Sequence, residues 1–239
     1  MSPGSGDDIR RRLRALEARV TEAARRVGRD PDQVRIVAVA KTVPADRVRS
    51  AVEAGCRTIG ENRVQEAESK VGRVADGLIG PPPSWHLVGP LQSNKARRAV
   101  TLFDVIETVD SLALAERLDR LAAELRPAAS YPVLLQVNVD ADPTKTGFAL
   151  EDVEAGTAAV LELPSLRVDG LMTIGRLTND PEATRPTFVA LRRLSEHLRA
   201  RHPGLGADLS MGMTDDFGVA VEEGATIVRV GRAIFGPRH

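Results

Sequence analysis

Short apolar segments rich in β-branched residues alternate with longer amphipathic segments from residue 35 to residue 231 of this 239-residue chain. The short segments predict strands at 35–41, 57–62, 85–90, 103–109, 133–139, 166–174, 208–212 and 226–231. Each connection is long enough for a crossover, so neighbouring strands are expected to run parallel. Eight such units predict an α/β fold, a single (β/α)8 TIM barrel domain over residues 1–239, with a doubly wound open sheet as the alternative.

An amphipathic segment also precedes the first predicted strand. Apolar residues recur at three- and four-residue steps over residues 8–27, which predicts an extra N-terminal helix. Further helices are predicted at 45–54, 63–77, 93–100, 112–125, 150–162, 183–202 and 214–222, with a short one after Gly231. No segment after the last predicted strand is long enough for a full helix. The N-terminal helix is therefore expected to fill that gap in the outer ring.

Composition excludes several classes of protein. Lysine plus arginine and aspartate plus glutamate each number 33, so the net charge is zero, whereas a dedicated nucleic-acid binder would be basic. No apolar run approaches the roughly 18 residues that a membrane helix needs, and the polar N-terminus has no secretion signal. Cys56 is the only cysteine and the four histidines are scattered, so neither a disulfide nor a metal site is expected. The predicted location is the cytoplasm.

A lysine ends the first predicted strand. Five apolar residues, 36–40, lead into Lys41, and Pro44 then prevents further strand pairing. Barrel folds carry their chemistry at the carboxyl ends of their strands. Desolvation there frees an amine to act as a nucleophile, and the alternative is a lysine that simply extends into solvent. The chain has only four lysines among its 33 basic residues, which favours a specific role for Lys41.

Two glycine-containing turns follow the last two predicted strands. One spans 210–214 and begins with the hydroxyl of Ser210, and the other spans 231–236 and begins with Gly231. Glycine allows close backbone approach, and barrels often bind phosphate at the loops after strands seven and eight. The two turns therefore predict a phosphate site, although glycines in such places can also serve turn geometry alone.

A lysine on the first strand and a phosphate site after the last two would face each other across the barrel mouth. An aldehyde cofactor that carries a phosphate would use both, with the aldehyde attached to Lys41 as a Schiff base. Arg229 lies two residues before Gly231 and on the same face of its strand, so it is placed to reach a ring nitrogen. Arginine does not share its proton, so the ring would stay unprotonated and be a weaker electron sink.

Seven motifs carry a resemblance to a known family. They are VAVAKT at 37–42, GENRVQE at 60–66, WHLVGPLQSNK at 85–95, GLM at 170–172, LSMGMTDD at 209–216, VRVG at 228–231 and IFG at 234–236. In this order they closely resemble the pyridoxal phosphate homeostasis protein family, which is similar to the barrel domain of alanine racemases. The resemblance covers nearly the whole chain and implies that pyridoxal 5′-phosphate is the cofactor.

The resemblance also assigns roles to individual residues. The implied cofactor-binding residues are Lys41, Asn62, His86, Met172, Ser210, Met211, Arg229, Gly231 and Arg232. Lys41 is the implied Schiff-base lysine, Ser210 and the backbone around Gly231 bind phosphate, and Arg229 faces the pyridine nitrogen. The family usually has serine or threonine where this chain has Arg232, so a phosphate-binding hydroxyl is lost, and the guanidinium either takes its place or extends into solvent. His86 is expected to form hydrogen bonds rather than to act as a base.

The implied function is to hold the cofactor and deliver it to apo-enzymes that depend on it, as a monomer and with little turnover. Racemases of the alanine type need a second acid/base group, usually a tyrosine. Tyr131 is the only tyrosine here, and it begins a predicted strand at the end away from the mouth. The alternatives are a minor amino-acid racemase or related enzyme, and a phosphate binder that forms no Schiff base. Lys145, in the loop after the fifth strand, is a second amine that could take the aldehyde transiently.

Overall fold

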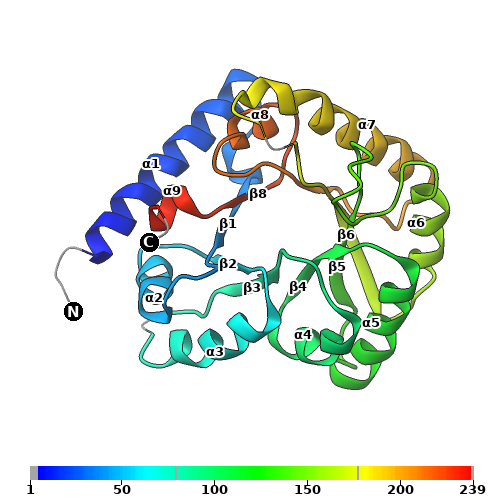
Figure 1. Cartoon of the computed structure of the whole chain (residues 1–239), viewed down its shortest axis with the longest axis horizontal. Helices are drawn as coiled ribbons and strands as arrows, with labels where there is room; N and C mark the ends of the chain where they lie inside the picture. Colours follow the sequence, from blue (N-terminus) through cyan, green and yellow to red (C-terminus); the bar gives the residue numbers. More distant parts are fainter. Residues whose placement is uncertain (1–4, 79, 177, 238–239) are drawn as a thin grey trace.

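The computed structural model describes residues 5–78, 80–176 and 178–237. Eight parallel strands form a closed barrel in sequence order, and a ring of helices surrounds it (Figure 1). The strands are β1 (Arg35–Val39), β2 (Thr58–Glu61), β3 (Ser84–Leu87), β4 (Val105–Val109), β5 (Tyr131–Gln136), β6 (Leu166–Met172), β7 (Asp208–Ser210) and β8 (Ile227–Val230). Pairing of β8 with β1, in which Val228 lies opposite Ile36, closes the sheet. The predicted barrel is confirmed, and the open sheet is excluded.

The helices follow the predicted order with small differences at their ends. They are α1 (Ser5–Arg26), α2 (Ala45–Glu53), α3 (Val64–Ala75), α4 (Ala96–Leu102), α5 (Leu112–Leu125), α6 (Val153–Leu161), α7 (Arg185–Arg201), α8 (Phe217–Glu222) and α9 (Arg232–Phe235). Residues 93–95, predicted as the start of a helix, form a separate 3-10 turn. The strands are shorter than predicted, mostly at their carboxyl ends, where the turns that carry the site begin. For example, β1 was predicted to reach Lys41 and ends at Val39.

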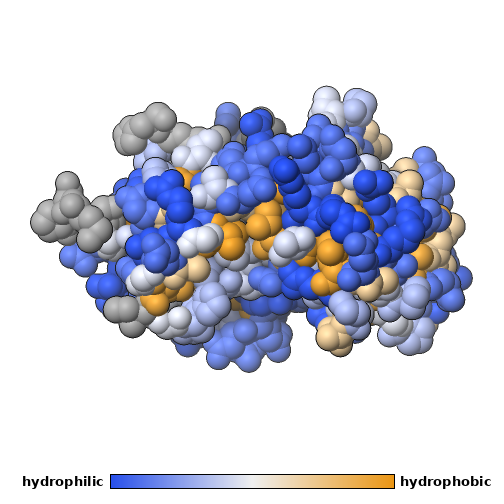
Figure 2. All heavy atoms as spheres, turned by 90° about the horizontal axis from the view of Figure 1, so that it is seen from below, coloured by the Kyte–Doolittle hydropathy of each residue, from blue (hydrophilic) through white to orange (hydrophobic). Residues whose placement is uncertain are grey.

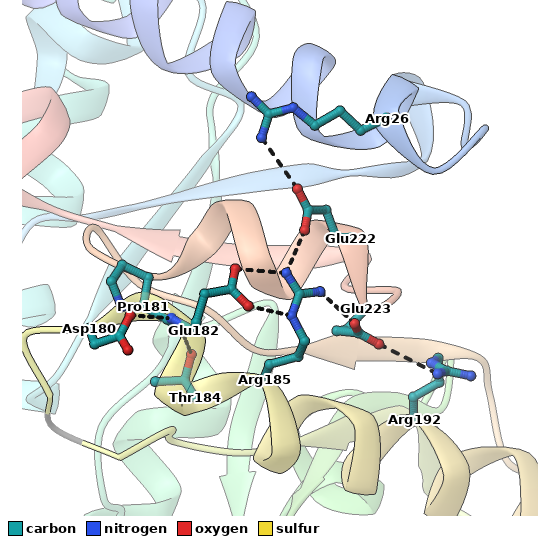
Figure 3. Close-up of polar contacts among 9 residues, drawn as sticks. All are labelled: Arg26, Asp180, Pro181, Glu182, Thr184, Arg185, Arg192, Glu222 and Glu223. Atoms are coloured by element: carbon teal, nitrogen blue, oxygen red, sulfur yellow. Dashed lines mark hydrogen bonds and ion pairs between the residues drawn. The ribbon is translucent and has the colours of Figure 1, made fainter.

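The N-terminal helix completes the outer ring, as predicted. Its apolar face, which includes Ile9 and Leu16, is buried, and α1 packs beside α2, α8 and α9 (Figure 1). Ion pairs then join it to its neighbours (Figure 3). Glu222 of α8 contacts Arg26 of α1 at 3.4 Å and Arg185 of α7 at 2.7 Å. This shared carboxylate links the N-terminal helix to α7 and α8, two consecutive helices from the other end of the chain.

The side of the molecule that faces the viewer in Figure 2 is mainly polar. Figure 2 shows hydrophilic residues over most of one side of the molecule, with hydrophobic residues only as small separate areas between them. Two arginines of α4 form ion pairs across neighbouring helices, Arg97 with Glu124 at 2.6 Å and Arg98 with Glu68 at 3.3 Å. Among the helices of the described residues, none combines the length and the apolar character needed to cross a bilayer.

Candidate functional site

A cavity of about 380 Å³ opens at the carboxyl ends of the strands. Its volume falls within the range of small-molecule sites, which is roughly 300–1,000 Å³. The lining residues are Val39, Lys41, Val43, Asn62, Val88, Ile174, Met213, Thr214, Asp215, Arg229, Gly231, Arg232, Phe235 and Gly236. Lys41 therefore shares one opening with the turns that follow β7 and β8. This was the central geometric expectation from the sequence.

A second cavity of similar volume lies between α1 and the amino ends of β1 and β2. It contains the buried Cys56, and burial raises the pKa of this thiol to about 12. The thiol is therefore protonated at neutral pH and is a poor nucleophile. Since barrel sites lie at the opposite face, the cavity at the carboxyl ends is the candidate site.

Lys41 lies in a tight turn immediately after β1. The carbonyl oxygen of Ala40 accepts a hydrogen bond from the amide of Val43 at 2.9 Å. Thr42 has a φ of 65°, in the left-handed region. A positive φ at the third position of such a turn is the mark of type II, which ordinarily has glycine or asparagine there. The turn directs the chain out of the barrel wall and leaves Lys41 half-buried at the cavity.

A chain of buried polar groups crosses the barrel interior beneath the cavity. Arg229 Nη1 donates to Ser210 Oγ at 2.6 Å, and Ser210 Oγ donates to Glu107 Oε2 at 2.5 Å. Glu107 Oε1 lies 2.6 Å from His86 Nδ1. Arg229 also donates to the carbonyl of Thr173 at 2.8 Å. The chain connects a charged group at the cavity, Arg229, to a carboxylate that water does not reach.

Burial and charge act in opposite directions on Glu107. Burial alone would raise the pKa of its carboxyl group, but the hydrogen bond and charge of His86, the charge of Arg229 and the hydrogen bond from Ser210 lower it. The net effect is a lowered pKa, so Glu107 is ionised at neutral pH. Burial also lowers the pKa of Arg229, and the charge of Glu107 opposes this shift. The sequence analysis did not select Glu107; the only signal for it there was an acidic residue inside an apolar predicted strand.

Ser210 is completely buried, and its hydroxyl is already bonded to both Arg229 and Glu107. The hydroxyl-bearing residue that lines the cavity from the same loop is Thr214, which the sequence analysis did not select. Met211, Met172 and His86 are also buried and do not line the cavity. His86 forms the hydrogen bond expected of it. Contacts of these four buried residues with a cofactor stay predictions.

The guanidinium of Arg232 forms an ion pair with Asp215, and both residues line the cavity. Arg232 is mainly exposed, so it lies at the rim rather than in the interior. Lys145 lies elsewhere in the neighbouring loops: its amine donates to the carbonyl oxygens of Ile174 at 3.2 Å and Gly175 at 3.1 Å. It does not line the cavity. Transfer of an aldehyde to Lys145 would require these bonds to break, and it stays a prediction.

Comparison with known proteins decides the family. The family described as alanine racemase, N-terminal domain, matches residues 12–239. A pyridoxal phosphate homeostasis protein of Pseudomonas aeruginosa is 45% identical over 233 residues, which cover 96% of each chain. The protein of that name from Escherichia coli K12 is 40% identical over 238 residues, which cover 97% of each. The chain belongs to the pyridoxal phosphate homeostasis protein family.

Solved structures agree with this family assignment. PipY of Synechococcus elongatus PCC7942, solved with PLP bound, is 41% identical to this chain with a TM-score of 0.82. The match covers 95% of this chain and 100% of PipY. An alanine racemase of Clostridium difficile 630 has a TM-score of 0.71 at 15% identity, over 97% of this chain and 57% of the racemase. At that identity the racemase shows a shared fold alone, which agrees with the predicted racemase-like barrel.

Proposed function

We propose that this chain binds pyridoxal 5′-phosphate as a Schiff base with Lys41 and serves in its homeostasis, as a carrier that delivers it to apo-enzymes. The observation that supports this most directly is the single cavity lined by Lys41, Arg229, Thr214 and Gly231. It supplies an amine for an aldehyde, donors for a phosphate and a cation for a ring, so the residues present fit the cofactor. The relatives' name and the PLP bound to PipY point to the same ligand.

Each group has a defined task in this proposal. The amine of Lys41 would hold the aldehyde as a Schiff base, with the aldehyde oxygen released as water. Thr214 and the backbone at Gly231 hold the phosphate at the start of α8 and α9, with Arg232 at the rim. Arg229, held by Ser210 and Thr173, presents its guanidinium to the ring nitrogen. Bound pyridoxal phosphate would supply an electron-withdrawing ring. An arginine partner would leave its nitrogen unprotonated, which makes the ring a weaker electron sink than the protonated ring that a carboxylate partner stabilises.

The position of Tyr131 supports a carrier over an efficient racemase. Tyr131 is the first residue of β5, at the end of the strand away from the cavity, and its hydroxyl donates to the carbonyl of Phe103 at 2.8 Å. Burial raises the pKa of this phenol above its usual range. Two-base racemisation needs a second proton donor opposite the lysine. A carrier with little turnover is the proposal that this arrangement favours, and its cytoplasmic location and monomeric state stay predictions from the sequence.

The attachment site is tested by trapping. The wild-type protein is incubated with pyridoxal phosphate, reduced with borohydride and digested, and the modified peptide is located by mass spectrometry. We expect the label on Lys41 and its loss in Lys41→Ala, while Lys95→Ala labels as the wild type does. Because the chain has only four lysines, every alternative site can be followed. Equal labelling of the wild type and Lys41→Ala would contradict the proposal.

Turnover is tested separately with the loaded protein. We expect incubation with L-alanine to yield D-alanine no faster than free pyridoxal phosphate does at the same concentration. The physical reason is that the described lining residues other than Lys41 include no tyrosine, histidine or cysteine to complete a two-base reaction, and the carboxylate among them, Asp215, is exposed and paired with Arg232. Sustained racemisation that is lost in Lys41→Ala would replace the carrier with the racemase alternative.

A further inference from the structure

The turn that presents Lys41 contains a residue unsuited to its conformation. The third position of this type II turn requires a positive φ, and the chain places threonine there, with φ of 65° at Thr42. A β-branched side chain is strongly disfavoured in the left-handed region, where glycine and asparagine are the usual residues. Something outside the turn must therefore hold Thr42 in place.

Two side chains of α3 contact the backbone on both sides of Lys41. Glu66 Oε2 accepts a hydrogen bond from the amide of Thr42 at 2.8 Å. Lys70 Nζ donates to the carbonyl oxygen of Ala40 at 2.8 Å. The same ammonium lies 3.3 Å from Glu66 Oε2, which joins the two contacts. The peptide groups before and after Lys41 are thus fixed to one helix.

The ammonium of Lys70 is itself fully coordinated. Its third acceptor is Glu61 Oε1 at 2.7 Å, and Glu61 is completely buried at the end of β2. Lys70 is 8% exposed, and a buried lysine is tolerated only when its protons have acceptors. Burial raises the pKa of Glu66, but the hydrogen bond from Thr42 and the interactions with Lys70 outweigh it and lower that pKa. Glu66 is therefore an anion at neutral pH, suited to accept from an amide and an ammonium.

We propose that Glu66 and Lys70 are positioning residues that hold the strained turn at Thr42, and thereby keep the amine of Lys41 at the cavity. Neither residue lines the cavity, so their effect acts through the backbone. A turn held in advance avoids the loss of conformational freedom that would otherwise accompany binding. This inference rests on the proposed function, because it concerns how the proposed attachment lysine is presented.

The test compares variants of α3 that differ in what they can offer Thr42. Glu66→Ala removes the acceptor, and we expect the dissociation constant for pyridoxal phosphate to rise about tenfold, with a matching fall in the rate of borohydride-trapped label on Lys41. Glu66→Gln keeps an acceptor oxygen, so we expect a rise of no more than about threefold. Glu68→Gln is the matched control: Glu68 is exposed on the same helix and pairs with Arg98, and binding should be unchanged.

A second substitution separates positioning from general loss of structure. Glycine adopts a positive φ without strain, so Thr42→Gly in the Glu66→Ala background is expected to restore the dissociation constant to within about threefold of the wild type. A merely structural role of Glu66 would not be repaired at position 42. Thermal unfolding of the ligand-free variants, measured in parallel, reports any general destabilisation.

The outcomes distinguish the two proposals. If wild-type protein carries no label on Lys41, the proposed function itself fails. If the wild type is labelled on Lys41 but Glu66→Ala binds and labels equally well, the positioning role is wrong. A loss of binding in Glu66→Ala that Thr42→Gly does not restore also contradicts it. Loss in Glu66→Ala with recovery in the double variant supports it.

Discussion

Glu107→Leu is expected to lower the free energy of unfolding by about 3–5 kcal/mol, which corresponds to a fall in Tm of roughly 6–20 °C. Glu107 is the buried anion that balances Arg229 and accepts hydrogen bonds from Ser210 and His86. Leucine removes this charge, so that the buried guanidinium of Arg229 keeps only the weaker influence of Asp216. The cost is the desolvation of that guanidinium, because the groups that accept its hydrogen bonds, the hydroxyl of Ser210 and the carbonyl of Thr173, are neutral.

Urea unfolding followed by circular dichroism measures this effect. Glu124→Leu is the control, because Glu124 forms an exposed pair with Arg97 and its loss should cost no more than about 1 kcal/mol. Glu107→Gln keeps the shape and should fall between the two. A cost for Glu107→Leu that equals the control would show that the buried chain contributes little to stability. Weaker binding of pyridoxal phosphate is also expected, because Ser210 loses its hydrogen bond to Glu107 and Arg229 loses the charge that balances it.

The lowered pKa of Glu107 also predicts that the stability of the folded protein depends on pH. The folded-state pKa of Glu107 is lowered, so its stabilising contribution is present above the unfolded-state value of about 4.3 and is lost as the pH falls through the folded-state value. Wild-type stability should therefore fall below about pH 4.3, and Glu107→Gln should show a shallower fall over the same range. If the stabilities of the wild type and Glu107→Gln fall equally as the pH is lowered, other carboxylates cause the acid sensitivity.

Gly89→Ala is expected to cost about 1–3 kcal/mol of stability and to weaken cofactor binding by roughly tenfold or more. A Cβ at residue 89 would overlap the carbonyl oxygen of Asn62 and lie 2.7 Å from its Cα. Movement of Gly89 itself would strain the hydrogen bond that its carbonyl accepts from the buried Thr108 at 2.8 Å. The backbone of Asn62 must shift instead, and Asn62 lines the cavity.

Binding titrations and thermal unfolding test this pair of effects together. Gly72→Ala is the matched control, because a Cβ there meets nothing within 4 Å and Gly72 lies inside α3. Alanine in that helix should raise stability by about 0.5–1 kcal/mol and leave binding unchanged. If Gly89→Ala binds pyridoxal phosphate as tightly as the wild type, the position of Asn62 does not matter for the cofactor.

Regular features of the fold were predictable from the sequence because each depends on a local pattern. Apolar runs separated by amphipathic segments determine the number and order of strands, and strand exits in a parallel barrel necessarily converge on one face. That Lys41 and Gly231 lie at the same opening followed from this rule alone. The role of α1 in the outer ring was predictable for a similar reason, since a vacant place in the ring exposes apolar surface that a helix can cover.

The buried polar contacts were decided by the tertiary structure alone. Ser210 and Glu107 are 103 residues apart, and no local pattern shows that the hydroxyl of Ser210 bridges an arginine and a glutamate. Likewise Glu66 and Lys70 read as ordinary charged residues on a helix until their contacts with the Lys41 turn are seen. The order of the elements is determined by patterns along the chain, whereas the task of a polar side chain depends on which distant partner lies within hydrogen-bonding distance when water is excluded.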